Sequence, residues 1–123
     1  MQTITAILQV TAALGLLNVW LLRFNRPTPY RGGNAGSMRE EFAAYGLPAW
    51  FPYFIGALKI GSAAALIAGL WLPVLVLPAA LLLCVLMLGA LSMHLKIRDP
   101  LKKSLPALFM LAIGLAICWG STR

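Results

Sequence analysis

Four long runs of apolar residues dominate the chain, and the short segments between them hold nearly all of its charges. An α-helix needs roughly 20 apolar residues to cross the hydrocarbon core of a bilayer. Residues 3–22, 51–72, 74–95 and 104–121 meet or approach that length. The pattern therefore predicts an all-α fold, a four-transmembrane-helix bundle that forms one integral membrane domain over residues 1–123.

The second and third runs follow each other without a charged residue between them, so their boundary depends on residues that break helices. Proline disfavours helix at the residue before it, and Gly69 precedes Pro73 by one helical turn. We therefore expect a tight hairpin at Pro73. In the fourth run, Pro106 is expected in the first helical turn, where its missing N–H does no harm.

The connection before the second run predicts a short helix. Residues 37–40 read Ser-Met-Arg-Glu, which matches a capping box, and a glycine and a proline beyond Tyr45 would end the helix there. Met38, Phe42 and Tyr45 share one face of this helix. The segment suits a cytoplasmic interfacial helix between the first two spans, lying on the membrane surface or lidding the bundle. A linker with a single helical turn is the alternative.

Composition narrows the class of protein. Charged residues make up 11% of the chain, against about a quarter in soluble domains, and the mean hydropathy is +0.87. These values exclude a soluble cytoplasmic enzyme and a disordered tail, and two distant cysteines make no secreted disulfide scaffold. No basic residue precedes the first run and no small-residue cleavage site follows it, so we expect a retained helix rather than a signal peptide.

Basic residues predict the orientation. The net charge is +7, and the connections at 23–50 and 96–104 each hold several of the basic residues. Four spans put both connections on one side, which the positive-inside rule makes cytoplasmic, with both termini outside a bacterial inner (plasma) membrane. The bilayer is the expected partner, and its headgroups are expected to contact Arg23, Arg26, Lys102 and Lys103. No nucleic-acid partner is expected, because aromatic residues do not alternate with the basic ones.

Tryptophan positions agree with four spans. Trp20 and Trp50 fall at the predicted cytoplasmic ends, and Trp71 and Trp119 fall at the outer ends. The indole ring favours the headgroup region, so all four are expected in the two interfacial belts.

Small residues recur every four positions in two spans, where they would let helices approach closely. We expect these stripes to make tight contacts within the bundle or across a homo-oligomer. Their members are Gly61, Ala65 and Gly69 in the second span and Ala112, Ala116 and Gly120 in the fourth.

Lys59 is the one formally charged residue inside a predicted span. A charge at the bilayer centre costs at least about 2.5 kcal/mol, so it usually has a partner or a task. In a functional role, Lys59 would anchor a polar or anionic ligand head or the carbonyl of a quinone. In a structural role, it would reach toward the cytoplasmic side and pair with Glu40 or Glu41. Asn18 and Asp99 are further candidate partners.

Other polar residues in the spans are weaker candidates. His94 could carry protons, because imidazole titrates near neutrality, or it could cap helix carbonyls. Gln9 and Asn18 should face the bundle as ligand contacts or, more simply, as interhelical hydrogen-bond donors. Cys84 and Cys118 lack a Cys-x-x-Cys pair and are expected to be packing residues. No metal site is expected, because the chain has a single histidine.

Several motifs, taken in order, resemble the DoxX-like family of small four-helix integral membrane proteins. They are Phe-Ala-Ala-Tyr-Gly-Leu-Pro at 42–48, Gly-Ala-Leu-Lys-Ile-Gly at 56–61, Ala-Ala-Leu-Ile-Ala-Gly-Leu at 64–70, Leu-Met-Leu-Gly-Ala at 86–90, His94 and Asp99-Pro100. The resemblance implies a membrane subunit or accessory of quinone-linked sulfur oxidation or redox-stress complexes, or an assembly chaperone for other membrane proteins. It also implies that polar residues recur at the positions of Lys59 and His94.

Three functions follow as hypotheses. The first is an inner-membrane accessory protein that binds a partner membrane subunit, a lipid or a quinone, without independent catalysis. The second is a quinone-site membrane subunit of an oxidoreductase, with Lys59 polarising the quinone carbonyl and His94 relaying protons. The third is a small oligomeric transporter or channel, although the acid that small multidrug exporters use in their first span is absent here. The cofactor stays open between a quinone and a lipid.

Overall fold

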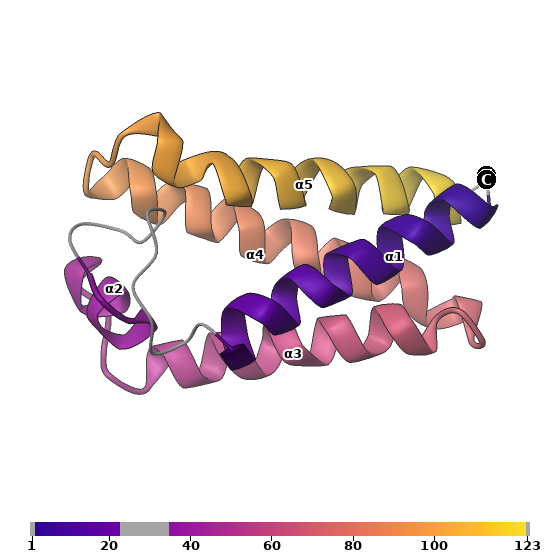
Figure 1. Cartoon of the computed structure of the whole chain (residues 1–123), viewed down its shortest axis with the longest axis horizontal. Coiled ribbons are helices and arrows are strands. Elements are labelled where there is room, and N and C mark those ends of the chain that lie inside the picture. Colours follow the sequence, from indigo (N-terminus) through magenta and orange to yellow (C-terminus); the bar gives the residue numbers. More distant parts are fainter. Residues whose placement is uncertain (1, 23–34, 123) are drawn as a thin grey trace.

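The structure is a computed structural model that describes residues 2–22 and 35–122, and over these residues the fold is all-α (Figure 1). The elements are α1 (Gln2–Leu17), a π-helical segment η1 (Asn18–Leu22), α2 (Met38–Ala44), α3 (Phe51–Ala68), a 3₁₀ turn η2 (Pro73–Leu75), α4 (Val76–Lys96) and α5 (Leu101–Ser121). In this part of the chain, four helical stretches are long and apolar enough to cross a membrane. The predicted four spans and the short helix between the first two are confirmed.

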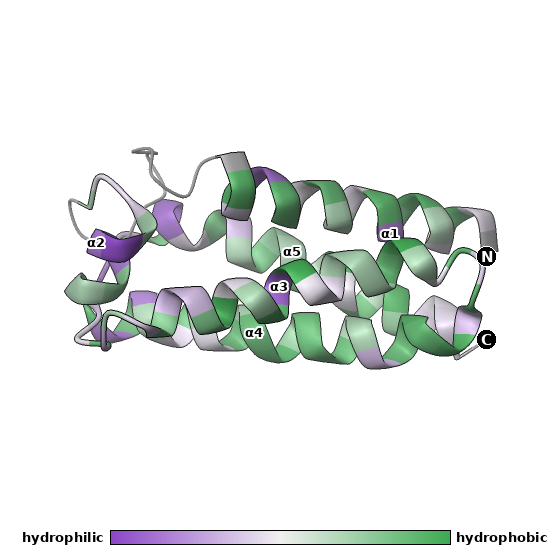
Figure 2. Cartoon of the chain, turned by 90° about the horizontal axis from the view of Figure 1, so that it is seen from below, coloured by the Kyte–Doolittle hydropathy of each residue, from purple (hydrophilic) through white to green (hydrophobic). Residues whose placement is uncertain are grey.

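The four long helices lie along one another, and each packs against two neighbours. α1 contacts α3 and α5, and α4 also contacts α3 and α5. Figure 1 shows α2 at the end of the bundle where α3 begins and α4 ends, with the α3–α4 hairpin at the opposite end. We call these the α2 end and the hairpin end. Figure 2 shows apolar residues along the length of the helices and polar residues gathered near α2.

The outer surface of the bundle is apolar. Ile7, Val85 and Phe109 are 60%, 64% and 67% exposed, whereas Leu66 and Ile117 are completely buried between the helices. A soluble monomer rarely exposes apolar surface this extensively, but contact with lipid requires it. The four spans therefore place this protein in a lipid bilayer.

The α3–α4 hairpin forms where the sequence predicts it. Gly69 caps α3, and Pro73 opens the 3₁₀ turn that leads into α4. A Cβ on Gly69 would lie 2.5 Å from Val76 Cγ2, so glycine permits the close approach of the two helices. From α1, Gln9 Nε2 donates a hydrogen bond to Leu66 O at 2.9 Å. That oxygen is among the last four carbonyls of α3, which a helix does not satisfy fully by itself.

α2 has the predicted cap and the predicted buried face. Ser37 is the N-cap, and its Oγ accepts a hydrogen bond from the Glu40 backbone N–H at 3.3 Å. Gly46 follows the helix with a φ of 81°, a conformation that favours glycine. The apolar face is buried against the bundle through Met38, Phe42 and Tyr45. α2 is therefore a lid on the bundle and not a linker.

Trp20 differs from its sequence prediction. Its side chain is only 5% exposed, so it lies inside the bundle and not in an interfacial belt. A Cβ on Gly56 would lie 2.8 Å from Trp20 Cε3, so this glycine of α3 makes room for the indole ring. The ring also meets Phe42 of the lid edge-on, with centroids 6.1 Å apart. The other three tryptophans are between 58% and 75% exposed, in agreement with the predicted belts.

α5 begins earlier than predicted. The chain reverses at Arg98, where φ is 57°, and Pro100 then precedes the first residue of the helix. Pro106 consequently lies in the second turn of α5 and not in the first. At this position it lacks the N–H that would donate to the carbonyl of Lys102.

The predicted small-residue stripes make tight contacts only in part. A Cβ on Gly120 would overlap the side chain of Thr5, so α1 and α5 approach closely there. Gly61 has no neighbouring atom within 4 Å of such a Cβ, and Ala112 and Ala116 are exposed. Close contact across an oligomer through these exposed members stays a prediction.

Candidate functional site

A cavity of about 740 Å³ lies within the bundle beneath α2. Its walls come from α2, the end of α1 with η1, the first half of α3, the second half of α4 and the first turns of α5. Sites for small molecules usually measure about 300–1,000 Å³ and combine apolar walls with a few polar groups. Apolar side chains supply most of this lining, among them Leu16, Val19, Phe51, Ile55, Leu86, Met87, Met93 and Met110.

Lys59 lines this cavity from the middle of α3, and the residue is 9% exposed. Its Nζ lies 4.8 Å from the centroid of the Trp20 ring, which is a cation–π distance. Glu41 of the lid lines the same cavity and attracts the ammonium electrostatically. Among the described residues, none accepts a hydrogen bond from Lys59 Nζ or forms an ion pair with it. The ammonium group is thus available to a ligand.

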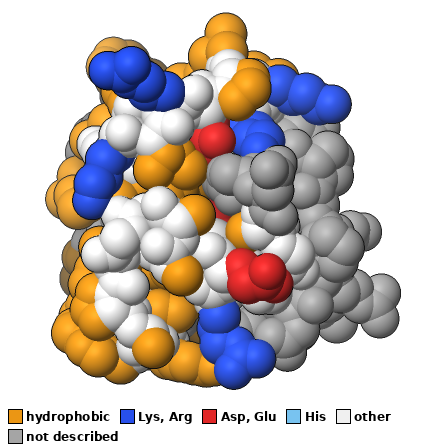
Figure 3. Space-filling model, turned by 90° about the vertical axis from the view of Figure 1, so that its left-hand side faces the viewer, with side chains coloured by type: hydrophobic (Ala, Val, Ile, Leu, Met, Phe, Trp, Pro, Cys, Tyr) orange, Lys and Arg blue, Asp and Glu red, His pale blue; other side chains and the backbone are white. Residues whose placement is uncertain are grey.

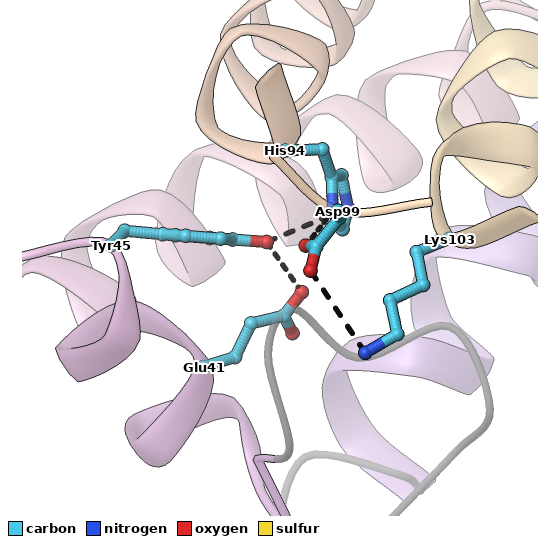
Figure 4. A network of polar contacts seen from close by, with 5 residues as sticks. All are labelled: Glu41, Tyr45, His94, Asp99 and Lys103. Carbon is cyan, nitrogen blue, oxygen red and sulfur yellow. Dashed lines mark hydrogen bonds and ion pairs between the residues drawn. The ribbon is translucent and has the colours of Figure 1, made fainter. Parts of the chain in front are cut away.

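A chain of polar side chains continues from the cavity toward the α2 end, and Figure 4 shows its five members. The Tyr45 hydroxyl donates to Glu41 Oε1 at 2.7 Å and lies 3.5 Å from His94 Nε2. On the other side of the ring, His94 Nδ1 lies 2.7 Å from Asp99 Oδ2. Lys103 Nζ completes the chain, 3.9 Å from Asp99 Oδ1. Buried polar groups are costly unless they are satisfied, and here they satisfy one another.

Local helical geometry explains how these side chains meet. Glu41 and Tyr45 are four residues apart, so they share a face of α2. His94 lies in the last turn of α4, and the reversal at Arg98 returns Asp99 to it, with the Asp99 N–H donating to His94 O at 2.9 Å. The lid face and the α4–α5 turn therefore converge on His94.

Lys96 fastens the lid to α4. Its Nζ donates a hydrogen bond to the Tyr45 backbone carbonyl at 2.8 Å, at the C-cap of α2. A cation near the last carbonyls of a helix is favourable, because those groups carry the negative end of the helix dipole. Tyr45 is thus held twice, by its carbonyl and by its hydroxyl.

Figure 3 views the molecule from the α2 end. Lys and Arg side chains spread around the part of this end that the structure describes, and acidic side chains lie between them. Arg39, Lys96, Arg98 and Lys102 are exposed, whereas Glu41 and the Asp99 carboxylate are buried. The buried acids consequently belong to the site, and the outer basic residues belong to the surface around it.

The structure brings together several residues that the sequence singled out. Lys59, His94 and Asn18 all line the cavity, Asn18 from the π-helical segment that the sequence did not predict. Such segments occur often at functional sites. Gln9 does not line the cavity; it makes the interhelical hydrogen bond that was its simpler predicted role.

The predicted headgroup contacts divide into three cases. Lys103 lines the cavity and lies near Asp99, so it belongs to the site as well. Lys102 is exposed, as a headgroup contact would be. Arg23 and Arg26 lie outside the described residues.

Sequence reasoning missed two site residues, Tyr45 and Trp20, and considered Glu41 and Asp99 as possible partners of Lys59. The spacing of Glu41 and Tyr45 on one face of the lid could have revealed their pairing. No sequence signal could have shown that Trp20 turns inward, because its space is provided by Gly56 on another helix.

The two cysteines lie apart from the cavity. Cys84 is buried on α4, and its Sγ would lie 2.8 Å from a Cβ on Gly114 of α5; Cys118 is partly buried. Neither lines the cavity. Across residues 2–22 and 35–122, no group of three or more His, Cys, Asp or Glu side chains is placed to hold a metal ion.

Comparison with known proteins relates this arrangement to a family. The sequence model of a protein family, described as the DoxX-like family, matches residues 33–120. The chain belongs to the DoxX-like family. A relative from Bacillus subtilis strain 168, which bears the name uncharacterized protein YdgD, is 32% identical over 83 residues, 67% of this chain and 73% of the relative. No solved structure matches the chain. The DoxX-like match contains Glu41, Tyr45, Lys59, His94 and Asp99, whereas the α1 wall of the cavity precedes it.

Proposed function

We propose that this DoxX-like protein is a bacterial inner-membrane accessory protein that binds a quinone in the cavity beneath α2. The proposal rests on one observation: the buried ammonium of Lys59 faces a largely apolar cavity without an acceptor among the described residues. A quinone carbonyl would accept a hydrogen bond from this group. The ring and the tail of the quinone would contact the apolar and aromatic walls.

The charges beside Lys59 favour a quinone over an anionic lipid. Glu41 lines the same cavity as Lys59 and already balances part of its charge. An anionic headgroup at Lys59 would be repelled by this carboxylate in a medium of low dielectric constant. A neutral carbonyl oxygen takes the hydrogen bond without that repulsion.

The test is native mass spectrometry of the full chain, released from nanodiscs after incubation with decylubiquinone. We expect one bound decylubiquinone in the wild type and none in Lys59→Met. Lys59→Gln, which keeps a hydrogen-bond donor without the charge, should retain partial binding. Lys102→Met is the matched control, because Lys102 is exposed outside the cavity. Equal binding by Lys59→Met, or phospholipid adducts alone in the wild type, would overturn the proposal.

A second candidate is a quinone-site membrane subunit of an oxidoreductase whose electrons come from another subunit. It is favoured by the presence of His94 in the same cavity as Lys59, because reduction of a quinone consumes protons as well as electrons. Both candidates bind a quinone, but only in the second is the bound quinone reduced. Reduction of bound decylubiquinone by a co-purified partner subunit would favour the second.

We also propose that the α2 end faces the cytoplasm. Arg39, Lys96, Arg98, Lys102 and Lys103 all lie at this end, and the positive-inside rule assigns such an end to the cytoplasm. In a variant with both native cysteines replaced by alanine, Thr122→Cys should react with a membrane-impermeant maleimide in spheroplasts. Arg98→Cys should react only after lysis. The reverse pattern would overturn the orientation.

A further inference from the structure

The polar chain of Figure 4 runs between the wall of the cavity and the α2 end of the bundle, through contacts of 2.7, 3.5, 2.7 and 3.9 Å. Glu41, Tyr45 and His94 line the cavity and are 8%, 4% and 5% exposed. The Lys103 side chain at the far end is 20% exposed. Glu41, Tyr45 and His94 can each both donate and accept a proton, which movement of a proton along a buried chain requires, whereas the ammonium of Lys103 can only donate.

The hydroxyl of Tyr45 allows two arrangements of protons in this chain. A tyrosine hydroxyl carries one proton, so while Tyr45 donates to Glu41 its oxygen can only accept from His94. In that arrangement His94 Nε2 carries a proton. In the other arrangement, protonated Glu41 donates to the Tyr45 oxygen, and the Tyr45 hydroxyl donates to unprotonated Nε2. The two arrangements differ only in the position of one transferable proton, on His94 or on Glu41.

We propose that Tyr45 and His94 deliver a proton to Glu41 at the wall of the cavity, so that the ligand bound there is one that takes up a proton. The N–H bond at His94 Nε2 breaks as an O–H bond forms at Tyr45, and the original Tyr45 proton passes to Glu41 Oε1. One proton moves and no electron is transferred. This inference rests on the proposed quinone site and names the groups that would protonate the head group.

Asp99 is a positioning residue in this chain. Its carboxylate lies 2.7 Å from His94 Nδ1, so Nδ1–H can donate to it in both arrangements, which leaves Nε2 as the atom that exchanges the proton. Lys103 offsets the charge of Asp99 from α5. Glu41 on the lid and Lys59 on α3 line the same cavity as His94, and Lys96 lies on the same helix as His94. Lys96 is engaged with the Tyr45 carbonyl and not with the ring.

The distance between Tyr45 and His94, 3.5 Å, is at the long limit for a hydrogen bond. The two rings lie edge-to-face, with centroids 5.8 Å apart, so a small inward movement of the lid would shorten the distance from the Tyr45 hydroxyl to His94 Nε2.

A stopped-flow measurement tests the proposal. The full chain in nanodiscs is loaded with decylubiquinone and mixed with dithionite, and formation of the hydroquinone is followed. The quinone gains two electrons from dithionite and two protons, one through Glu41 and one from the buffer. We expect Tyr45→Phe to retain decylubiquinone, and we expect its bound quinone to be reduced about 100-fold more slowly than in the wild type, the lower end of what proton transfer by a side chain contributes. Tyr53→Phe, an exposed tyrosine of α3 outside the cavity, is the matched control.

The outcomes separate this inference from the function on which it rests. Wild-type protein that binds no decylubiquinone would overturn both. Binding with an unchanged reduction rate in Tyr45→Phe would overturn the proton delivery alone. If Tyr45→Phe lost decylubiquinone binding as well as the fast reduction, Tyr45 would have a structural role, and this result would also overturn the proton delivery.

The single histidine of the chain allows a second readout. In ¹⁵N-histidine NMR spectra, all ring signals of the full chain belong to His94. Glu41→Gln should change the proton occupancy of Nε2 when Tyr45 is present, and this response should be lost in the Tyr45→Phe background. Equal responses in both backgrounds would show that Glu41 acts on His94 through space, and the proposal would fail.

Discussion

The two ends of the bundle pack side chains of different size against their glycines. Toward the hairpin end, Gly69 and Gly120 bring helices close together, against Val76 and Thr5. In the half beneath α2, Gly56 instead makes room for a large side chain, the indole ring of Trp20. Gly15 does the same for Met110, and Trp20 and Met110 both line the cavity.

This difference has a physical meaning. Helices in lipid gain no hydrophobic energy from association and depend on close packing and on interhelical hydrogen bonds. The half of the bundle nearer the hairpin end, which we call the hairpin half, follows that rule, and the other half is the α2 half. The α2 half gives up some packing for a cavity and compensates with the lid, the aromatic contacts and the buried polar chain. We infer that the hairpin half carries most of the stability and that the α2 half carries the function.

The largest effect is expected from filling a tight glycine contact. Gly114→Leu would push against Cys84 Sγ, which lies 2.8 Å from an added Cβ, and overpacking of this kind costs about 1–3 kcal/mol. Gly61→Leu is the matched control, because nothing lies within 4 Å of a Cβ there and both changes improve helix propensity equally. The free energy of unfolding in mixed micelles measures both. A destabilised Gly61→Leu would point to a contact outside this chain, as across an oligomer.

The sequence predicts the fold better than the site, for reasons visible in particular residues. Helical spans follow from run length, the hairpin from Gly69 and Pro73, and the lid from a capping box, and all of these are local signals. The meeting of Tyr45 with His94 is not local, because it requires the lid to dock on α4 first. The inward turn of Trp20 likewise depends on a glycine in a different helix.

A smaller effect, confined to the lid, is expected from Lys96→Met. This change removes the hydrogen bond to the Tyr45 carbonyl, and one such bond contributes about 1 kcal/mol. Amide hydrogen exchange in α2 should become about fivefold faster, while exchange in the hairpin half stays unchanged. Lys102→Met is the control, since Lys102 is exposed at the same end of the bundle. Unchanged exchange in α2 would mean that the lid is held by its apolar face alone.

The smallest effect is expected from Gln9→Leu, which removes the hydrogen bond between α1 and α3 in the hairpin half. Interhelical hydrogen bonds in membranes average about 0.6 kcal/mol, and a leucine at this position would recover part of that by packing. Thr11→Val is the control, because the Thr11 hydroxyl donates within its own helix, to Ile7 O. Gln9 lies outside the cavity, so decylubiquinone binding should be unchanged in Gln9→Leu. Weakened binding at nearly unchanged stability would instead make Gln9 a ligand contact and would extend the functional half of the bundle toward the hairpin.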